Sequence, residues 1–229
     1  MRVRTIGIEE CASVDGPAVV LDVMRAFTVA AWAFERGAAR IVLSNSEDEA
    51  LELRDRLGAI AINDGLPDGR FDLLNSPDQV SGAALDDRVV VLRTDAGTAG
   101  AIASRHAPLL FCTGLVTAAA TVRELVDADI DDVTLVATGG EDDVACADYL
   151  TALLVDGHAD PAPFLARAAA APIVEHLAGF VRQGNAAVGP RDVELCLEVD
   201  RFDFAMRATD EDGLLTLVRI DEVSSSPSR

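Results

Sequence analysis

The chain has 229 residues, half of them hydrophobic, which suits one large or two small domains with a full core and excludes a disordered polypeptide. Its formal net charge of −20 argues against a nucleic-acid-binding surface, because such surfaces need clustered cations. The sequence contains no lysine, which excludes Schiff-base chemistry and the phosphate-binding lysine of a Walker loop.

Long apolar segments and metal-binding cysteine patterns are both missing from the sequence. No run approaches the roughly 18 apolar residues of a membrane helix, and the segment 1–6 is too poor in apolar residues for a signal peptide. We therefore expect a soluble cytoplasmic protein without membrane or nucleic-acid partners. The four scattered cysteines favour buried free thiols, and the three histidines lack metal-ligand spacing.

Strand-like and helix-like patterns alternate over the first two thirds of the chain. The predicted strands are the short apolar runs Val3–Ile8, Val19–Val23, Arg40–Leu43, Ala59–Ile62, Val89–Leu92, Leu109–Phe111 and Val133–Ala137. The predicted helices are Ala26–Arg36, Glu47–Leu57, Pro77–Leu85, Thr98–Arg105, Val116–Val126 and Val144–Val155. This order indicates an α/β fold with a largely parallel sheet covered on both faces.

The pattern changes after residue 158. Two Ala-rich helices are expected, the second over Ile173–Val181, followed by a short amphipathic stretch at Asp192–Val199 and a hairpin formed by Phe202–Arg207 and Leu214–Arg219. We therefore predict a core domain at 1–158, a C-terminal helical and hairpin subdomain at 159–223 packed on the core, and a disordered tail at 224–229. The hairpin could supply the edge of a homodimer.

Asp22 and Arg25 lie at the end of the second predicted strand, where a helix begins at once. The carboxyl ends of strands are where open α/β sheets bind ligands. A carboxylate can hold a divalent cation or act in general acid–base catalysis, and a guanidinium can bind phosphate. The alternative is a surface salt bridge at a helix start.

Two later turns carry groups that suit anion binding. Asn75 and Ser76 precede a helix whose first N–H groups are free, although Ser76 could be only an N-cap. Thr94, Gly97 and Thr98 follow another strand, and the glycine would let backbone amides approach a ligand. The alternative here is an ordinary strand–helix turn capped by Thr98.

A fourth turn combines glycines with acids. Gly139 belongs to a Thr-Gly-Gly turn that suits phosphate approach, and the acids at 141–143 could bind Mg²⁺ or simply favour the helix N-terminus. Asp148 follows within the helix, among small apolar residues. Because the carboxyl ends of parallel strands meet at one edge, the four turns together predict an anion site with a divalent metal. Mg²⁺, which takes one or two carboxylates plus waters and phosphate oxygens, suits this set better than zinc.

The same four stretches, in this order, resemble the 2-phosphosulfolactate phosphatase family. Its pattern D-V-L-R-A-T-T is similar to Asp22–Thr28, F-D-L-G-N-S-P to Phe71–Pro77, T-T-N-G-T-R-A to Thr94–Gly100, and its C-A-G segment and E-D pair to Ala137–Gly139 and Ala147-Asp148. The segment Asp192–Leu197 is also similar to the family's closing D-[IV]-x-x-C-L. The resemblance covers roughly residues 1–205.

The resemblance implies a three-layer α/β/α fold and Mg²⁺-dependent hydrolysis of a small anionic phosphate ester, 2-phosphosulfolactate, to sulfolactate and phosphate. Asp22 and Asp148 would hold the metal, and Arg25 would clamp an anionic group. Asn75, Ser76, Thr94, Gly97, Thr98 and Gly139 would bind the substrate. We favour attack by water, oriented by a carboxylate, over attack by a protein nucleophile.

Several positions depart from the family pattern. Ala96 and Ala99 replace an asparagine and an arginine, Ala147 replaces the glutamate of the E-D pair, and Leu74 replaces a glycine. Arg93 or Arg105 could restore the cation, and Glu141 or Asp143 the carboxylate. The alternatives that stay open are a catalytically weak or silent protein that binds an anionic metabolite, and a generic sugar- or nucleotide-binding α/β protein.

Overall fold

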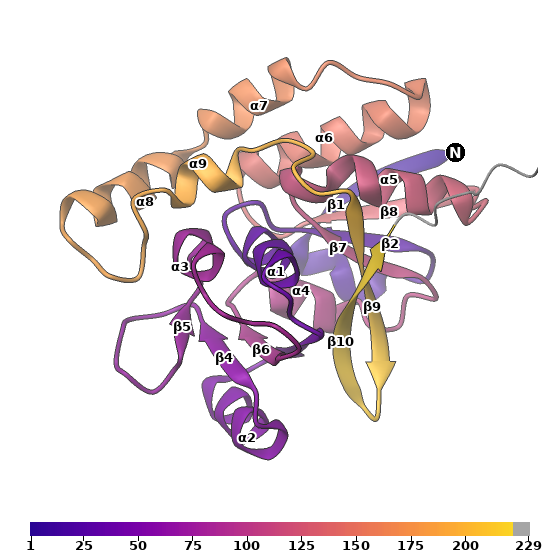
Figure 1. Cartoon of the computed structure of the whole chain (residues 1–229). Helices are drawn as coiled ribbons and strands as arrows, with labels where there is room; N and C mark the ends of the chain where they lie inside the picture. Colours follow the sequence, from indigo (N-terminus) through magenta and orange to yellow (C-terminus); the bar gives the residue numbers. More distant parts are fainter. Residues whose placement is uncertain (222–229) are drawn as a thin grey trace, which may run out of the picture.

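The computed structural model describes residues 1–221, so the expected tail at 224–229 lies outside the described residues (Figure 1). The strands are β1 (Arg2–Gly7), β2 (Ala18–Leu21), β3 (Arg40–Ser44), β4 (Ile60–Asn63), β5 (Leu73–Leu74), β6 (Val89–Arg93), β7 (Leu110–Thr113), β8 (Asp132–Ala137), β9 (Phe204–Glu211) and β10 (Leu214–Asp221). The helices are α1 (Ala26–Glu35), α2 (Glu47–Leu57), α3 (Pro77–Ser81), α4 (Gly97–Ala103), α5 (Ala118–Asp127), α6 (Glu141–Asp156), α7 (Ala162–Ala169), α8 (Pro172–Arg182) and α9 (Asp192–Cys196), with 3₁₀ turns at η1 (Ile8–Ser13) and η2 (Leu115–Thr117).

The predicted alternation of strands and helices is confirmed, and α2 has the predicted bounds. Ser46 caps α2 by accepting a hydrogen bond from the Glu49 N–H at 3.2 Å. Two local features differ from the prediction. Helix α3 ends at Ser81, before Gly82, and the two-residue strand β5 is too short to carry a strand signal of its own.

Within residues 1–221 the sheet has ten strands in the order β1-β8-β2-β7-β9-β10-β3-β6-β4-β5. Strands β1, β8, β2 and β7 are mutually parallel, and so are β3, β6, β4 and β5. The hairpin β9–β10 joins these two halves by antiparallel pairing with β7 and with β3. The sheet is therefore mixed, and largely parallel only within each half.

The position of the hairpin corrects the prediction that it belongs to a subdomain packed on the core. It completes the sheet between two parallel halves, and β9 and β10 each have a strand neighbour on both sides. Met206 and Leu217 of the hairpin are fully buried, which provides the physical reason for this position. Where β9 and β10 pair with β7 and β3, they offer no free edge to a second copy of the chain.

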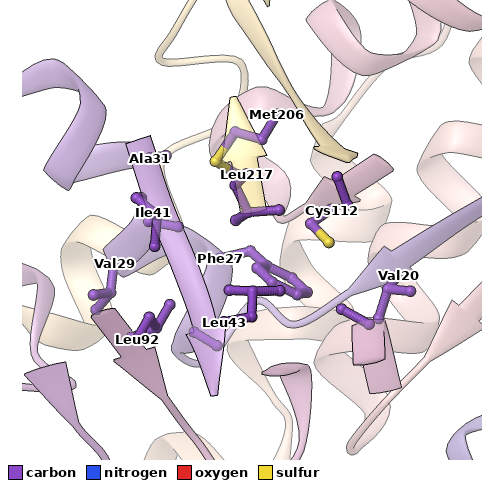
Figure 2. Packing of buried hydrophobic residues seen from close by; sticks show 14 of the residues in the cluster. Val20, Phe27, Val29, Ala31, Ile41, Leu43, Leu92, Cys112, Met206 and Leu217 are labelled. Atoms are coloured by element: carbon purple, nitrogen blue, oxygen red, sulfur yellow. The ribbon is translucent and has the colours of Figure 1, made fainter. Parts of the chain in front are cut away.

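Helix α1 lies at the centre of the main hydrophobic core. All of its residues from Ala26 to Ala31 are buried, and Phe27 contacts side chains from both halves of the sheet (Figure 2). Figure 2 shows Phe27 among Val20 of β2, Leu43 of β3 and Leu217 of β10. At the start of α1, the turn after β6 approaches the turn after β2.

Alternate strand residues pack into separate clusters on the two sides of the sheet. Val20 and Cys112 face the α1 cluster, whereas Val19 and Phe111 belong to a second cluster with residues of α5 and α6. A third cluster places α2 against β3 and β6. All four cysteines are buried and free, as predicted for Cys112 and Cys146.

Within residues 1–221 we find no single helix long and apolar enough to cross a membrane; only α7 and α8 together reach that length and composition, and they are bent by 52° relative to each other.

Candidate functional site

Asp22 lies immediately after β2 and is buried, with only 6% of its surface exposed. Its Oδ1 accepts a hydrogen bond from the Ala26 N–H at 3.0 Å, so the carboxylate is fixed at the start of α1. The pKa of Asp22 is raised to about 6, mainly by burial and in addition by the charges of Asp142 and Asp64, whereas the hydrogen bonds from the Ala26 and Gly97 N–H groups lower it. Asp22 is therefore a carboxylate that a cation would stabilise.

Gly97, the first residue of α4, approaches Asp22 so closely that a side chain would not fit. A Cβ at this position would lie 2.6 Å from Asp22 Oδ2 and 2.8 Å from the Ala26 Cβ. The glycine therefore allows the β6–α4 turn to reach the β2–α1 turn. The sequence analysis placed both residues in one site, and the structure brings them together.

Thr94 and Thr98 bind each other within the same turn. The Thr98 N–H donates to Thr94 Oγ1 at 3.1 Å, and the Thr98 hydroxyl donates to the Thr94 carbonyl at 2.7 Å. The Thr94 N–H in turn donates to Thr98 Oγ1 at 2.9 Å. Both threonines are buried, and these bonds fix the turn that presents Gly97.

The first turn of α6 supplies two carboxylates beside Asp22. Asp143 accepts hydrogen bonds from the Val23 N–H and the Gly139 N–H, both at 2.7 Å, and so ties the turn after β8 to the turn after β2. Burial raises the pKa of Asp143 well above its usual range, and the charges of Asp22 and Asp142 add to this. Burial likewise raises the pKa of Asp142. The Gly139 N–H, which was predicted to bind the substrate, therefore donates to the Asp143 carboxylate of the protein itself.

Asp148 lies elsewhere on α6, in an ion pair with Arg167 of α7 at 2.6 Å. Arg167 also binds Glu141, which lies on the same face of α6. The Asp148 and Arg167 side chains are 45% and 41% exposed. The structure therefore brings Asp142 and Asp143, and not Asp148, to the turn that contains Asp22.

Arg25 is buried between two carboxylates. Its Nη1 donates to Asp192 Oδ2 at 2.9 Å and to the Ala187 carbonyl at 2.8 Å, and its Nη2 donates to Asp64 Oδ1 at 3.2 Å. The side chain is only 8% exposed. Arg25 thus links the start of α1 to the end of β4 and to the C-terminal segment, and most of its donors are already engaged.

Asp192 is the functional candidate that the sequence reasoning missed. It is fully buried and accepts hydrogen bonds from Arg25, from the Ser76 hydroxyl at 2.6 Å, and from the Asp78 and Gly189 N–H groups at 3.0 Å. The signal was present, because Asp192 opens the segment that resembles the family's closing D-[IV]-x-x-C-L motif. The similarity of this segment to the motif does not by itself indicate what the aspartate does.

Ser76 and Asn75 lie where β5 leads into α3. Ser76 is the N-cap of α3, since its hydroxyl oxygen accepts a bond from the Gln79 N–H at 3.3 Å. Asn75 is 2% exposed, and within residues 1–221 its side-chain oxygen has no hydrogen-bond partner. A buried amide of this kind favours a further polar partner at the site.

A hollow of about 230 Å³ opens beside Arg25 and Asp64. Leu66 and Asp95 line it on the sheet side, and Phe180 and Val188 line it from the C-terminal segment. Because Asp64 also raises the pKa of Asp22, this hollow lies within electrostatic reach of Asp22.

Comparisons with known proteins identify relatives of this chain. A family profile described as 2-phosphosulpholactate phosphatase matches residues 6–211. A protein of Bacillus subtilis strain 168 named probable 2-phosphosulfolactate phosphatase is 28% identical over 215 residues, which cover 88% of this chain and 91% of the relative.

Two further relatives bear the same name. The protein from Deinococcus radiodurans is 36% identical over 59% of this chain, and the one from Thermus thermophilus is 34% identical over 66% of it. These two matches span 62% and 65% of the relatives' own lengths, somewhat less than two thirds. On the family match over residues 6–211, the chain belongs to the 2-phosphosulfolactate phosphatase family, whose members are hydrolytic enzymes.

Proposed function

We propose that this protein is a Mg²⁺-dependent hydrolase of a small anionic phosphate monoester. Family membership nominates 2-phosphosulfolactate as the substrate, with sulfolactate and phosphate as products. The observation that carries the proposal is the meeting of Asp22, Asp142 and Gly97, where burial and the charge of Asp142 raise the pKa of the Asp22 carboxylate.

The chemistry of these carboxylates fits Mg²⁺. Carboxylate oxygens are the donors that this hard cation prefers, and a divalent charge would offset the repulsion between Asp22 and Asp142. Within residues 1–221, no three His, Cys, Asp or Glu side chains are arranged to hold a metal ion unaided. Mg²⁺ does not need such a set, because waters and substrate phosphate oxygens complete its coordination.

We propose Asp22 and Asp142 as the metal-binding carboxylates. Asp142 takes the place that the sequence analysis gave to Asp148, because Asp148 is paired with Arg167. When bound, Mg²⁺ would stabilise the negative charge that develops on the phosphoryl group. Asp143 serves in positioning, because its oxygens hold the N–H groups of Val23 and Gly139.

The remaining residues would orient substrate and water. The buried Asp22 carboxylate would orient an attacking water beside the metal. The unpartnered Asn75 side-chain oxygen can accept a hydrogen bond from a hydroxyl group of the substrate or from a water. Arg25 holds the Asp64 and Asp192 carboxylates that shape this wall of the site.

The test is phosphate release from 2-phosphosulfolactate and a panel of phosphorylated hydroxy acids, with and without Mg²⁺. Asp22→Asn should lower Mg²⁺-dependent kcat/KM at least about 100-fold, as expected when a group that stabilises the transition state is removed. Asp148→Asn, the matched control on the outer face of α6, should stay within about threefold of the parent, because an exposed ion pair contributes little. If no ester releases phosphate while the esters still stabilise the protein against heat, the function is metabolite binding without hydrolysis.

A further inference from the structure

The two terminal nitrogens of Arg25 have partners of different kinds. Nη1 donates to Asp192, whose side chain is fully buried, and to the Ala187 carbonyl, at 2.9 and 2.8 Å. Nη2 donates to Asp64 at 3.2 Å, and the Asp64 side chain is 34% exposed. The Nη1 side is therefore part of the folded framework, whereas the Nη2 side can exchange its partner.

The Asp64 side chain can leave Arg25 without a movement of its main chain. The Asp64 N–H donates to the Arg93 carbonyl at 3.0 Å, and the Asp64 carbonyl accepts a hydrogen bond from Arg93 Nη1 at 3.2 Å. These two bonds tie the main chain of Asp64 to the end of β6. Separation of the carboxylate from Arg25 costs little, because water can hydrate a partly exposed carboxylate once it is released.

The hollow beside Asp64 gives an acidic group of a ligand access to the same nitrogen. Arg25 is the cation among the residues that line it, and Asp64 and Asp95 are the acids. Its volume of about 230 Å³ has room for a carboxylate or sulfonate with a few waters, since a water takes about 30 Å³. An acidic group that enters the hollow can therefore replace Asp64 at Arg25 Nη2.

This exchange would take place close to Asp22. Arg25 directly precedes Ala26, whose N–H donates to Asp22 Oδ1 at 3.0 Å. The charge of Asp64 also acts on the Asp22 carboxylate. An ester whose phosphate lies at Asp22 can therefore present a neighbouring acidic group to Arg25.

We propose that Asp64 is a specificity-determining residue, whose carboxylate occupies the Arg25 Nη2 position that a second acidic group of the substrate takes on binding. This inference rests on the proposed hydrolase function and adds to it a subsite for a carboxylate or sulfonate. Asp64 acts as an internal competitor. An ester without a second acidic group leaves the Asp64–Arg25 pair intact, and an ester with one separates it.

The test compares 2-phospholactate with propan-2-yl phosphate, which has a methyl group in place of the carboxylate. In Asp64→Asn the neutral amide competes less well for Arg25. The kcat/KM ratio of 2-phospholactate to propan-2-yl phosphate, measured with Mg²⁺, should therefore rise about fivefold, as expected when one partner of a partly exposed ion pair is removed. The change should fall on KM rather than kcat, because the exchanged group does not react. An unchanged or lower ratio would overturn the proposal.

Two further variants locate the effect. Asp64→Ala removes the last acceptor at this position and should raise the ratio at least as much as Asp64→Asn. Asp95→Asn is the matched control, because Asp95 also lines the hollow, but its ion-pair partner is Arg93, at 2.5 Å, rather than Arg25. The control should keep the ratio within about twofold of the parent. If Asp95→Asn raises the ratio as much as Asp64→Asn, the effect comes from the charge of the hollow alone and the proposal is wrong.

Binding measurements separate this inference from the proposed hydrolysis. If the parent cleaves neither ester, the hydrolase proposal fails. The dissociation constants of the two esters for the parent and Asp64→Asn, measured by calorimetry with Mg²⁺, then decide the inference by the same ratio. A ratio that Asp64→Asn does not raise, or the absence of 2-phospholactate binding to both proteins, would overturn it in that case.

Discussion

Replacement of Asp192 by asparagine should strongly destabilise the protein, although Asp192 is not in the proposed metal site. The carboxylate is fully buried and accepts hydrogen bonds from Arg25, Ser76 and two backbone N–H groups. The asparagine amide would place its own donors against these donors. It would also remove the charge that compensates the buried Arg25 guanidinium.

The size of the loss follows from the burial of the pair. Breaking a buried ion pair by removing one partner costs about 3–5 kcal/mol, because the remaining charge stays buried without compensation. Arg25 keeps its bond to Asp64, but that carboxylate is 34% exposed and is held at 3.2 Å, so it offsets little of the loss. We therefore expect Asp192→Asn to lower the free energy of unfolding by about 3–5 kcal/mol.

Asp148→Asn is the matched control, since it also removes a carboxylate from an Asp–Arg pair. Because both side chains of that pair are more than two fifths exposed, its loss should cost less than about 1 kcal/mol. Urea unfolding followed by circular dichroism measures both variants, with the midpoint compared at a constant m value. Equal losses in the two variants, or a loss below 1 kcal/mol for Asp192→Asn, would refute the reasoning from burial.

Two further predictions concern the Asp22 carboxylate itself. In the absence of divalent cations, the stability difference between the parent and Asp22→Asn should shift against the parent by about 2 kcal/mol between pH 4 and pH 7, because the folded state raises the pKa from 3.8 to about 6 and so favours the protonated carboxyl. Urea unfolding at several pH values measures this difference, and a shift toward the parent would contradict it. Gly97→Ala should lower Mg²⁺-dependent kcat/KM at least tenfold, because its Cβ would lie 2.6 Å from Asp22 Oδ2. Gly82→Ala, whose nearest contact would be 3.7 Å, should leave kcat/KM unchanged; a loss there as well would show that destabilisation alone explains the Gly97 result.

The parts of the fold that depend on neighbouring residues could be predicted from the sequence. Ser46 and Ser76 cap their helices as their sequence context indicates, because a cap bond spans only three residues. The alternation of apolar strands and helices likewise predicts a largely parallel sheet, and the structure has parallel pairing within each half of the sheet. These features need no knowledge of what lies across the molecule.

The position of the hairpin could not be predicted in the same way. Its alternating pattern indicates two paired strands, but the pattern does not say which outer strands they meet. That choice depends on the burial of Met206 and Leu217 against α1 and β3, which are distant in sequence. Long-range packing therefore decided the sheet order.

The choice among the acids of α6 required the direction of each side chain. Asp148 is separated from Glu141 by seven residues, about two helical turns, so both point to Arg167 on the outer face. Asp142 and Asp143 point instead toward the β2–α1 turn. In the sequence, these two acids could either bind Mg²⁺ or simply stabilise the N-terminus of the helix. Only the tertiary contacts of their side chains favour the first interpretation over the second.

Arg25 illustrates why a correct site residue can still have a different role. Its position after β2 predicted an anion clamp, but the structure engages it with Asp192, which is 167 positions away in the sequence, and with Asp64. An arginine held by two carboxylates fixes the wall of a pocket and contributes little free positive charge to it. On the proposed function, recognition of the phosphate then rests on a divalent cation at Asp22 and Asp142. The scarcity of free cations in the site therefore favours the proposed dependence on a divalent metal.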